Sequence, residues 1–188
     1  MRLRPDLPVV YSPDDAAKVA TRAVKYRERG VVGLGVAPLV DVAGAEPFAR
    51  AFAIARDGGL AADRIRQGIR ADEDRALVAE LAGRGTVLDV CPLSNLRLGI
   101  VGSLDEHPLP RLVAAGVHCS ISTDDPALLD TDLNRDYQAA TSLGLEPRSL
   151  YDAGVAGALC DDKTRERLRA IGSQYDWRSA TAALGGAR

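Results

Sequence analysis

Short apolar runs alternate with amphipathic stretches along most of the chain. Four apolar runs and a weaker first one are short enough to be buried strands, at 31–36, 64–69, 86–90 and 117–122, with the first at 8–11. The stretches between them carry apolar residues at helical spacing. Strands that alternate with helices of about ten residues predict βαβ units and a parallel sheet. The pattern therefore indicates an α/β protein with about four to five parallel strands.

Capping residues mark where several helices begin. Ser12 precedes Pro13 and is followed by Asp15, which predicts a capped helix to about residue 28. Ser103 and Glu106 form a second capping-box pattern, which predicts a helix that ends before Gly116. Two further helices are expected at 47–56 and 73–82, and after Asp132 only helices, at 132–143, 147–159 and 162–171. No domain boundary is visible, so residues 1–188 are expected to form a single domain with a helical C-terminal cap.

The number of strands falls short of a complete barrel. A (β/α)₈ barrel has eight strands and usually about 250 residues, whereas this chain has 188 residues. The chain is therefore an open sheet or an incomplete (β/α)₈ TIM-type barrel. A partial barrel exposes strand edges and an apolar face. We therefore expect self-association or a partner chain that covers them.

Composition excludes several classes of protein. Hydrophobic residues make up 46% and charged residues 27%, which is typical of a globular chain. The net charge of -2 argues against a nucleic-acid or membrane-surface partner. No apolar run reaches the roughly 18 residues of a membrane span, and no signal peptide is visible, so a cytoplasmic protein is expected. The three cysteines are widely spaced, which argues against both a disulfide framework and a cysteine-ligated zinc.

Two adjacent carboxylates, Asp124 and Asp125, follow the strand expected at 117–122. Like charges this close raise each other's pKa unless a cation or a donor compensates them. The carboxyl ends of parallel strands are where ligand sites collect, so the pair indicates a metal or polar-ligand site. Alone, the same pair before a proline is more often a helix cap or turn. The chain also has only His107 and His118, whereas a catalytic zinc usually has about three protein ligands, mostly histidine.

Three motifs give these residues a context. Residues 88–95 read LDVCPLSN, residues 122–126 read STDDP, and residues 64–68 read RIRQG. In this order and spacing they resemble the adenosine deaminase family, zinc-dependent purine nucleoside aminohydrolases with an amidohydrolase-type barrel. The similarity runs from roughly Tyr11 to Trp177, and residues 91–126 carry its most specific part.

The resemblance implies a role for each matching residue. Asp124 matches the zinc-ligating aspartate, Asp125 matches the purine-contacting aspartate, and Gln67 stands where the family has its catalytic histidine. A glutamine amide does not titrate near neutrality, so Gln67 cannot act as a general base. The H-x-H and H-A-G-E motifs, which supply the other ligands and the proton donor, are not found, and Pro38 replaces a glycine. No catalytic residue set is intact, Asp124 is a vestigial ligand, and zinc is expected to be absent or weakly bound.

Three hypotheses remain open at this point. The chain is a deaminase relative that is catalytically incompetent alone, because its zinc-binding and proton-transfer residues are mostly missing. Alternatively, a hetero-partner supplies the missing strands and rebuilds an active site, which a second copy cannot do. The third hypothesis is a non-catalytic module that binds a purine nucleoside through Asp125. The sequence does not name the purine among adenine, adenosine and modified nucleosides.

Overall fold

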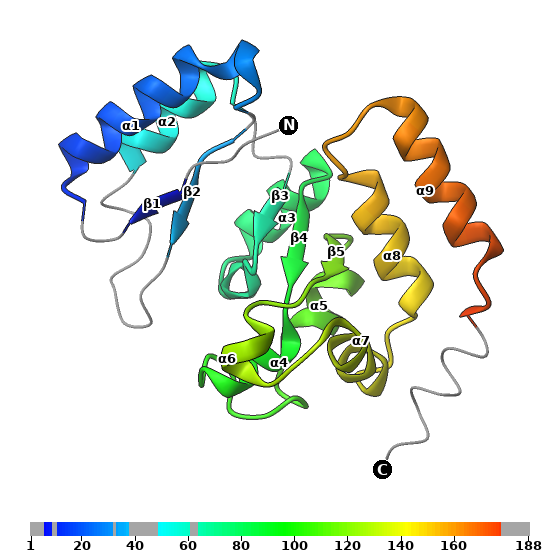
Figure 1. Cartoon of the computed structure of the whole chain (residues 1–188). Coiled ribbons are helices and arrows are strands. Elements are labelled where there is room, and N and C mark those ends of the chain that lie inside the picture. Colours follow the sequence, from blue (N-terminus) through cyan, green and yellow to red (C-terminus); the bar gives the residue numbers. More distant parts are fainter. Residues whose placement is uncertain (1–5, 9–10, 32, 38–48, 61–63, 178–188) are drawn as a thin grey trace. The chain divides into compact units, whose positions relative to one another are not determined.

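The computed structural model describes residues 6–8, 11–31, 33–37, 49–60 and 64–177. The chain forms two compact units, Met1–Ala62 and Asp63–Arg188 (Figure 1). Every strand pair found in the described residues is parallel, so the α/β class predicted from the alternating pattern is confirmed. A single domain over residues 1–188 stays a prediction.

The first unit is a parallel strand pair with two helices. Its elements are β1 (Asp6–Pro8), α1 (Pro13–Lys25), the 3₁₀ helix η1 (Arg27–Arg29), β2 (Gly35–Ala37) and α2 (Ala49–Asp57). The predicted cap of α1 is confirmed, because the Ser12 hydroxyl accepts a hydrogen bond from the Asp15 amide at 3.2 Å. Alanines let α1 and α2 pack closely around the fully buried Leu7. Both strands start away from the expected positions: β1 begins two residues earlier, and β2 begins four residues later.

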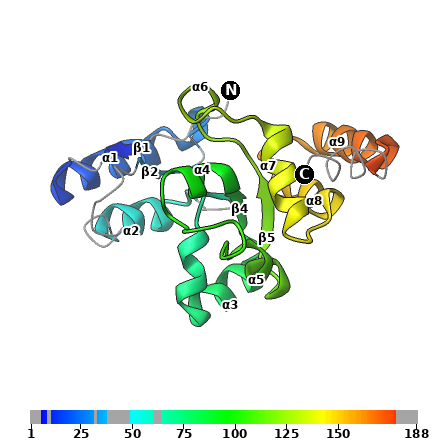
Figure 2. The same ribbon diagram turned by 90° about the horizontal axis from the view of Figure 1, so that it is seen from below.

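The second unit contains a three-stranded parallel sheet. Its strands are β3 (Arg64–Arg66), β4 (Val87–Val90) and β5 (His118–Ile121), in that spatial order. The connections contain the 3₁₀ helix η3 (Ile69–Glu73), α3 (Arg75–Arg84), α4 (Pro92–Arg97) and α5 (Leu109–Ala114). Figure 2 shows α3 and α5 together on one side of the sheet. Their leucines bury that face, which alternation along the strands makes apolar: Leu81, Leu109 and Leu112 against Leu88, Val90, Cys119 and Ile121.

The opposite face of this sheet is polar. The Arg64 guanidinium donates to the Asp89 carboxylate, at 2.9 Å from Nε to Oδ2, and to the Ser120 hydroxyl. Its Nη1 also donates to the Gly154 carbonyl of α8 (Pro147–Ala156) at 2.8 Å. Both views place α8 beside β5 (Figures 1 and 2). The arginine therefore ties all three strands to α8, since Arg64, Asp89 and Ser120 each come from a different strand.

The C-terminal part is helical, as the sequence indicates. It contains α6 (Pro126–Leu129), α7 (Leu133–Ser142), α8 and α9 (Asp162–Gln174). Within the described ranges, no helix has the length and apolarity needed to cross a membrane.

Two sequence predictions for the second unit were wrong in detail. The capping-box pattern at Ser103 opens no helix: residues 101–106 form turns and bends, and α5 begins at Leu109. Pro108 explains this start, because a proline disfavours the helical conformation of the residue before it, whereas Pro110 lies in the first turn, where proline is tolerated. The strand expected at 64–69 stops at Arg66, because Gln67 and Gly68 have positive φ values of 60° and 72°. Ile69 therefore lies in η3 rather than in a strand.

Candidate active site

The candidate site lies at the carboxyl ends of β3, β4 and β5. In the parallel register Arg66 lies opposite Asp89, and Asp89 lies opposite Ser120. The residues that follow these three positions therefore meet at one edge of the sheet, where parallel α/β proteins place their ligand sites. Two of the predicted site residues, Gln67 and Asp124, are brought together there.

Asp124 is held by three donors. Arg66 Nη2 lies 2.5 Å from Oδ1, Ser94 Oγ donates to Oδ2 at 2.8 Å, and Gln67 Nε2 donates weakly to Oδ2 at 3.5 Å. The Asp124 side chain is 25% exposed and that of Arg66 is 53% exposed. The cation that compensates the carboxylate is therefore an arginine of this chain, which the sequence analysis did not single out.

Gln67 is fixed by the loop that follows β4. Its Oε1 accepts from the Asn95 Nδ2 at 3.0 Å and from the Cys91 amide at 3.3 Å. With the carbonyl oxygen used in this way, the Nε2 end of the amide is the end that faces Asp124. Gln67 is thus part of the site. Its Nε2 donates a hydrogen bond to Asp124, and its amide has no atom basic enough to accept a proton.

His107 belongs to the same chain of hydrogen bonds, through its contact with Asn95. Its ring is 1% exposed, Nδ1 accepts from the Leu109 amide at 3.1 Å, and Nε2 lies 3.1 Å from Asn95 Oδ1. Because Nδ1 accepts, the proton of the neutral ring is on Nε2 and is donated to Asn95. A relay therefore runs from His107 through Asn95 and Gln67 to Asp124.

The buried histidine gives a pH dependence to the stability of the second unit. Burial, with a smaller effect of Arg111, lowers the pKa of His107 from 6.5 to about 4. The unfolded chain then binds more protons between these pKa values, so stability is present above pH 6.5 and is lost as pH falls toward 4. We expect a loss of about 3 kcal/mol, measured by urea unfolding across this range.

The variant His107→Gln removes this titration and is expected to show a flatter pH profile. His118→Gln is the matched control, because His118 is exposed at the start of β5 and its loss should leave the profile unchanged. Identical pH profiles for the wild type and His107→Gln would contradict the assignment. Asp136, whose pKa is raised by burial, contributes with the opposite sign, and its contribution cancels in this comparison.

Asp125 caps a helix. Its Oδ1 accepts from the Leu128 amide at 3.1 Å at the start of α6, and the residue is exposed. The helix-cap interpretation of the tandem aspartates is therefore confirmed for Asp125. Its role as a purine contact stays a prediction.

Asp136 on α7 is a site-adjacent residue that sequence reasoning missed. It is fully buried, and its Oδ1 accepts from the Leu93 amide at 2.9 Å in the first turn of α4. Burial raises its pKa, and the hydrogen bond from Leu93 opposes this effect. Asp136 thereby attaches α7 to the segment that carries Ser94 and Asn95. A lone aspartate in a helical pattern gives no sequence signal for this role.

The residues present do not fit a catalytic zinc. In the portion of the chain that the structure describes, no three histidine, cysteine, aspartate or glutamate side chains cluster as a metal site. Arg66 already places a positive charge against Asp124, in competition with any cation. Cys91 is 1% exposed, and burial raises the pKa of its thiol to about 12, so it supplies no thiolate. The donor set therefore disagrees with the zinc chemistry that the sequence motifs suggest.

Comparison with known proteins assigns the family. The adenosine deaminase family model matches residues 59–171, which is more than half of the chain. The aminodeoxyfutalosine deaminase of Acidothermus cellulolyticus is 44% identical over 97% of this chain, and the adenine deaminase of Rhizobium johnstonii is 36% identical over 85%. The chain belongs to the adenosine deaminase family.

The chain spans less than two thirds of these relatives, 59% and 58% of their lengths. The alignment with the Acidothermus protein extends over 211 positions, more than the 188 residues of this chain. It therefore contains positions where the relative has residues that this chain lacks, as expected from the missing H-A-G-E motif.

Solved structures show the same fold. A zinc-bound amidohydrolase from Burkholderia ambifaria matches with a TM-score of 0.75 at 22% identity, over 97% of this chain and 58% of its own. The N6-methyl-AMP deaminase of Arabidopsis thaliana matches with a TM-score of 0.73 at 23% identity, over 93% and 59%. At this identity the likeness concerns the fold alone, which is that of the amidohydrolase barrels.

Proposed function

We propose that this protein is an adenosine deaminase-family member that is catalytically incompetent as the 188-residue chain. The observation that carries the proposal is the ion pair between Asp124 and Arg66, at 2.5 Å, where the family pattern calls for an aspartate on zinc. An arginine neutralises the carboxylate, but it cannot polarise a water as a divalent cation does. In this proposal the strands are the remnant of an incomplete barrel.

Proton transfer is the second missing function. Hydrolytic deamination requires a group that takes a proton from water and a group that gives one to the purine ring. Gln67 does not titrate, His107 is buried with both ring nitrogens hydrogen-bonded, and burial raises the pKa of Cys91 to about 12. None of these three side chains is therefore suited to take or give the proton.

The test is a turnover assay on the purified chain with added zinc. We expect no release of ammonia above a protein-free blank from adenine, adenosine or aminodeoxyfutalosine, with the Acidothermus relative as the active control. Saturable turnover that scales with the concentration of this chain would contradict the proposal, provided that Asp124→Asn abolishes it.

A second candidate is a deaminase completed by a hetero-partner. The half-exposed side chain of Arg66 favours it, because an arginine at the surface can move away when other ligands approach Asp124. In this case, co-expression with a chain that carries H-x-H and H-A-G-E strands is expected to produce turnover that neither chain has alone. A mixture that remains inactive despite forming a stable complex would exclude this candidate.

Purine binding without turnover is the remaining alternative. The exposed Asp125 is then the contact that a purine nucleoside meets, with one carboxylate oxygen used by the Leu128 amide. Calorimetry with adenosine separates this case, because binding that is lost in Asp125→Asn while turnover stays absent would favour it.

A further inference from the structure

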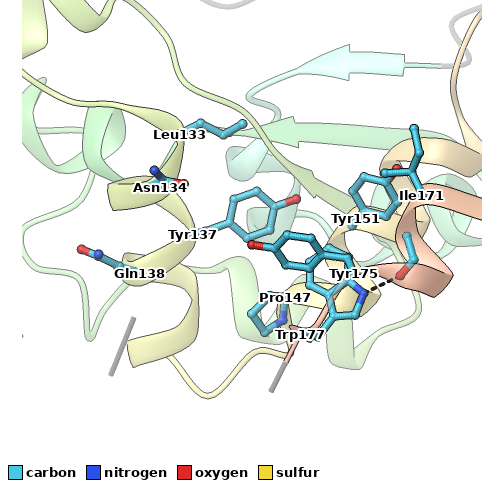
Figure 3. A pocket seen from close by; sticks show the side chains of 10 residues that line it. Leu133, Asn134, Tyr137, Gln138, Pro147, Tyr151, Ile171, Tyr175 and Trp177 are labelled. Atoms are coloured by element: carbon cyan, nitrogen blue, oxygen red, sulfur yellow. Dashed lines mark hydrogen bonds between the residues drawn. The ribbon is translucent and has the colours of Figure 1, made fainter. Parts of the chain in front are cut away.

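The second unit also has a pocket whose lining is largely aromatic, unlike the polar site around Asp124. It lies among α7, α8, α9 and the turn after α9, has a volume of about 580 Å³, and is shown in Figure 3. Four of the chain's eight aromatic side chains line it, in a protein whose aromatic content is only 4%: Tyr137, Tyr151, Tyr175 and Trp177. Half of the aromatic residues of the chain therefore line this one pocket.

The aromatic rings form a packed wall. The ring centroids of Tyr151 and Trp177 are 5.3 Å apart, and those of Tyr175 and Trp177 are 4.6 Å apart in an edge-on arrangement. Gly172 makes room for this wall, because a β-carbon there would lie 2.5 Å from Tyr151 Cε1. Tyr175 is 54% exposed, so the wall is open to solvent on one side.

The polar ends of two of these side chains are used within the protein. Tyr151 Oη donates to the Leu168 carbonyl at 2.8 Å, and Trp177 Nε1 donates to the Gly172 carbonyl at 2.7 Å, the dashed line in Figure 3. These bonds fix both rings in place. The remaining polar side-chain groups of the lining are the hydroxyls of Tyr137 and Tyr175 and the amides of Asn134 and Gln138, two residues of α7.

The lining is also uncharged. It includes no lysine, arginine, histidine, aspartate or glutamate among the described residues. Burial raises the pKa of Tyr137 to about 12, so this phenol stays neutral. A charged ligand would lose hydration here without gaining a counter-charge.

We propose that this pocket binds a planar, uncharged aromatic or heteroaromatic molecule that carries an amide-like edge. Small-molecule sites typically have about 300–1,000 Å³, mostly apolar walls and a few polar groups. Stacking against the tyrosine and tryptophan rings supplies the attraction. The hydroxyls of Tyr137 and Tyr175 and the amide of Asn134 offer donors and acceptors to the edge of the ring.

The pocket is separate from the Asp124 site, although both involve α7. Asp136 and Ala140 are buried on this helix, and Asp136 binds the Leu93 amide beside the Asp124 site. Tyr137 and Gln138 belong to the lining of the pocket instead. The proposal therefore does not depend on the proposed function.

Trp177 is the only tryptophan of the chain, so its fluorescence reports directly on this pocket. The full chain is titrated with benzamide, a neutral planar amide, and in parallel with benzoate, its anionic counterpart of the same shape. We expect a saturable change of Trp177 emission with benzamide. The affinity for benzoate is expected to be weaker by a factor of about ten or more. Calorimetry checks that saturation corresponds to one benzamide per chain.

Two variants make the result specific. Tyr175→Ala is expected to weaken benzamide binding about tenfold, and its exposed ring makes loss of folding an unexpected outcome. Arg84→Ala, an exposed change on α3 outside the lining, should leave benzamide binding unchanged. Quenching that stays linear with benzamide concentration, or binding that Tyr175→Ala leaves intact, would overturn the proposal. A change of Trp177 emission with protein concentration alone would also overturn it, since a second copy would then cover the pocket.

Discussion

Arg64→Ala is expected to lower the free energy of unfolding of the second unit by about 3 kcal/mol. The Arg64 and Asp89 side chains are only 23% and 16% exposed, so removing the guanidinium leaves a carboxylate without its partner inside the protein. The variant also removes the donors to Ser120 and to the Gly154 carbonyl. Urea unfolding followed by circular dichroism measures the difference.

Arg84→Ala is the matched control for this experiment. Arg84 pairs with Glu80 on the surface of α3, where the two side chains are 67% and 52% exposed. Exposed pairs of this kind contribute about 0–1 kcal/mol, so the control should unfold close to the wild type. Equal stability losses for the two variants would mean that the Arg64 network does not hold the sheet together.

Gly157→Ala is expected to cost about 1–3 kcal/mol through overpacking. A β-carbon at Gly157, at the end of α8, would lie 2.4 Å from Cγ2 of the fully buried Val87. The φ of Gly157 is -85°, so the backbone itself accepts an alanine and the loss measures the contact alone. Thermal unfolding detects it as a lower midpoint.

Gly83→Ala is the matched control and is expected to raise the stability rather than lower it. Gly83 lies within α3, and nothing is found within 4 Å of the position of an added β-carbon. An alanine there should stabilise the helix by about 0.5–1 kcal/mol. If Gly157→Ala were also neutral or stabilising, α8 would not be packed against β4 as closely as the structure shows.

Local chemistry explains which elements the sequence could predict. The strands β4 and β5 are compact runs that follow a glycine, so their bounds were expected to within one residue. The helix α1 begins where its capping residues predict, and it ends three residues before the expected end. The short helices α4 and α6 were missed because they are single turns within loops, begun by Pro92 and Pro126. The capping pattern at Ser103 failed because the prolines that follow it decide where α5 begins.

The candidate site was predictable in position but only partly in its contacts. The resemblance assigned Gln67 and Asp124 to one site, and the parallel register brings the strand ends that precede them to one edge of the sheet. The pairing of Arg66 with Asp124 joins residues 58 positions apart, so it depends on strand register and on side-chain direction. The expectation that an adjacent pair of carboxylates needs a compensating cation pointed to such a residue without naming it.

Zinc stoichiometry tests the central claim most directly. The chain is produced in zinc-supplemented medium, desalted, and its metal content is measured by mass spectrometry alongside the Acidothermus relative. Arg66 neutralises Asp124, and the described residues contain no cluster of three metal-ligating side chains. We therefore predict far less than one zinc per chain. One zinc per chain that survives desalting and is lost in Asp124→Asn would contradict the account.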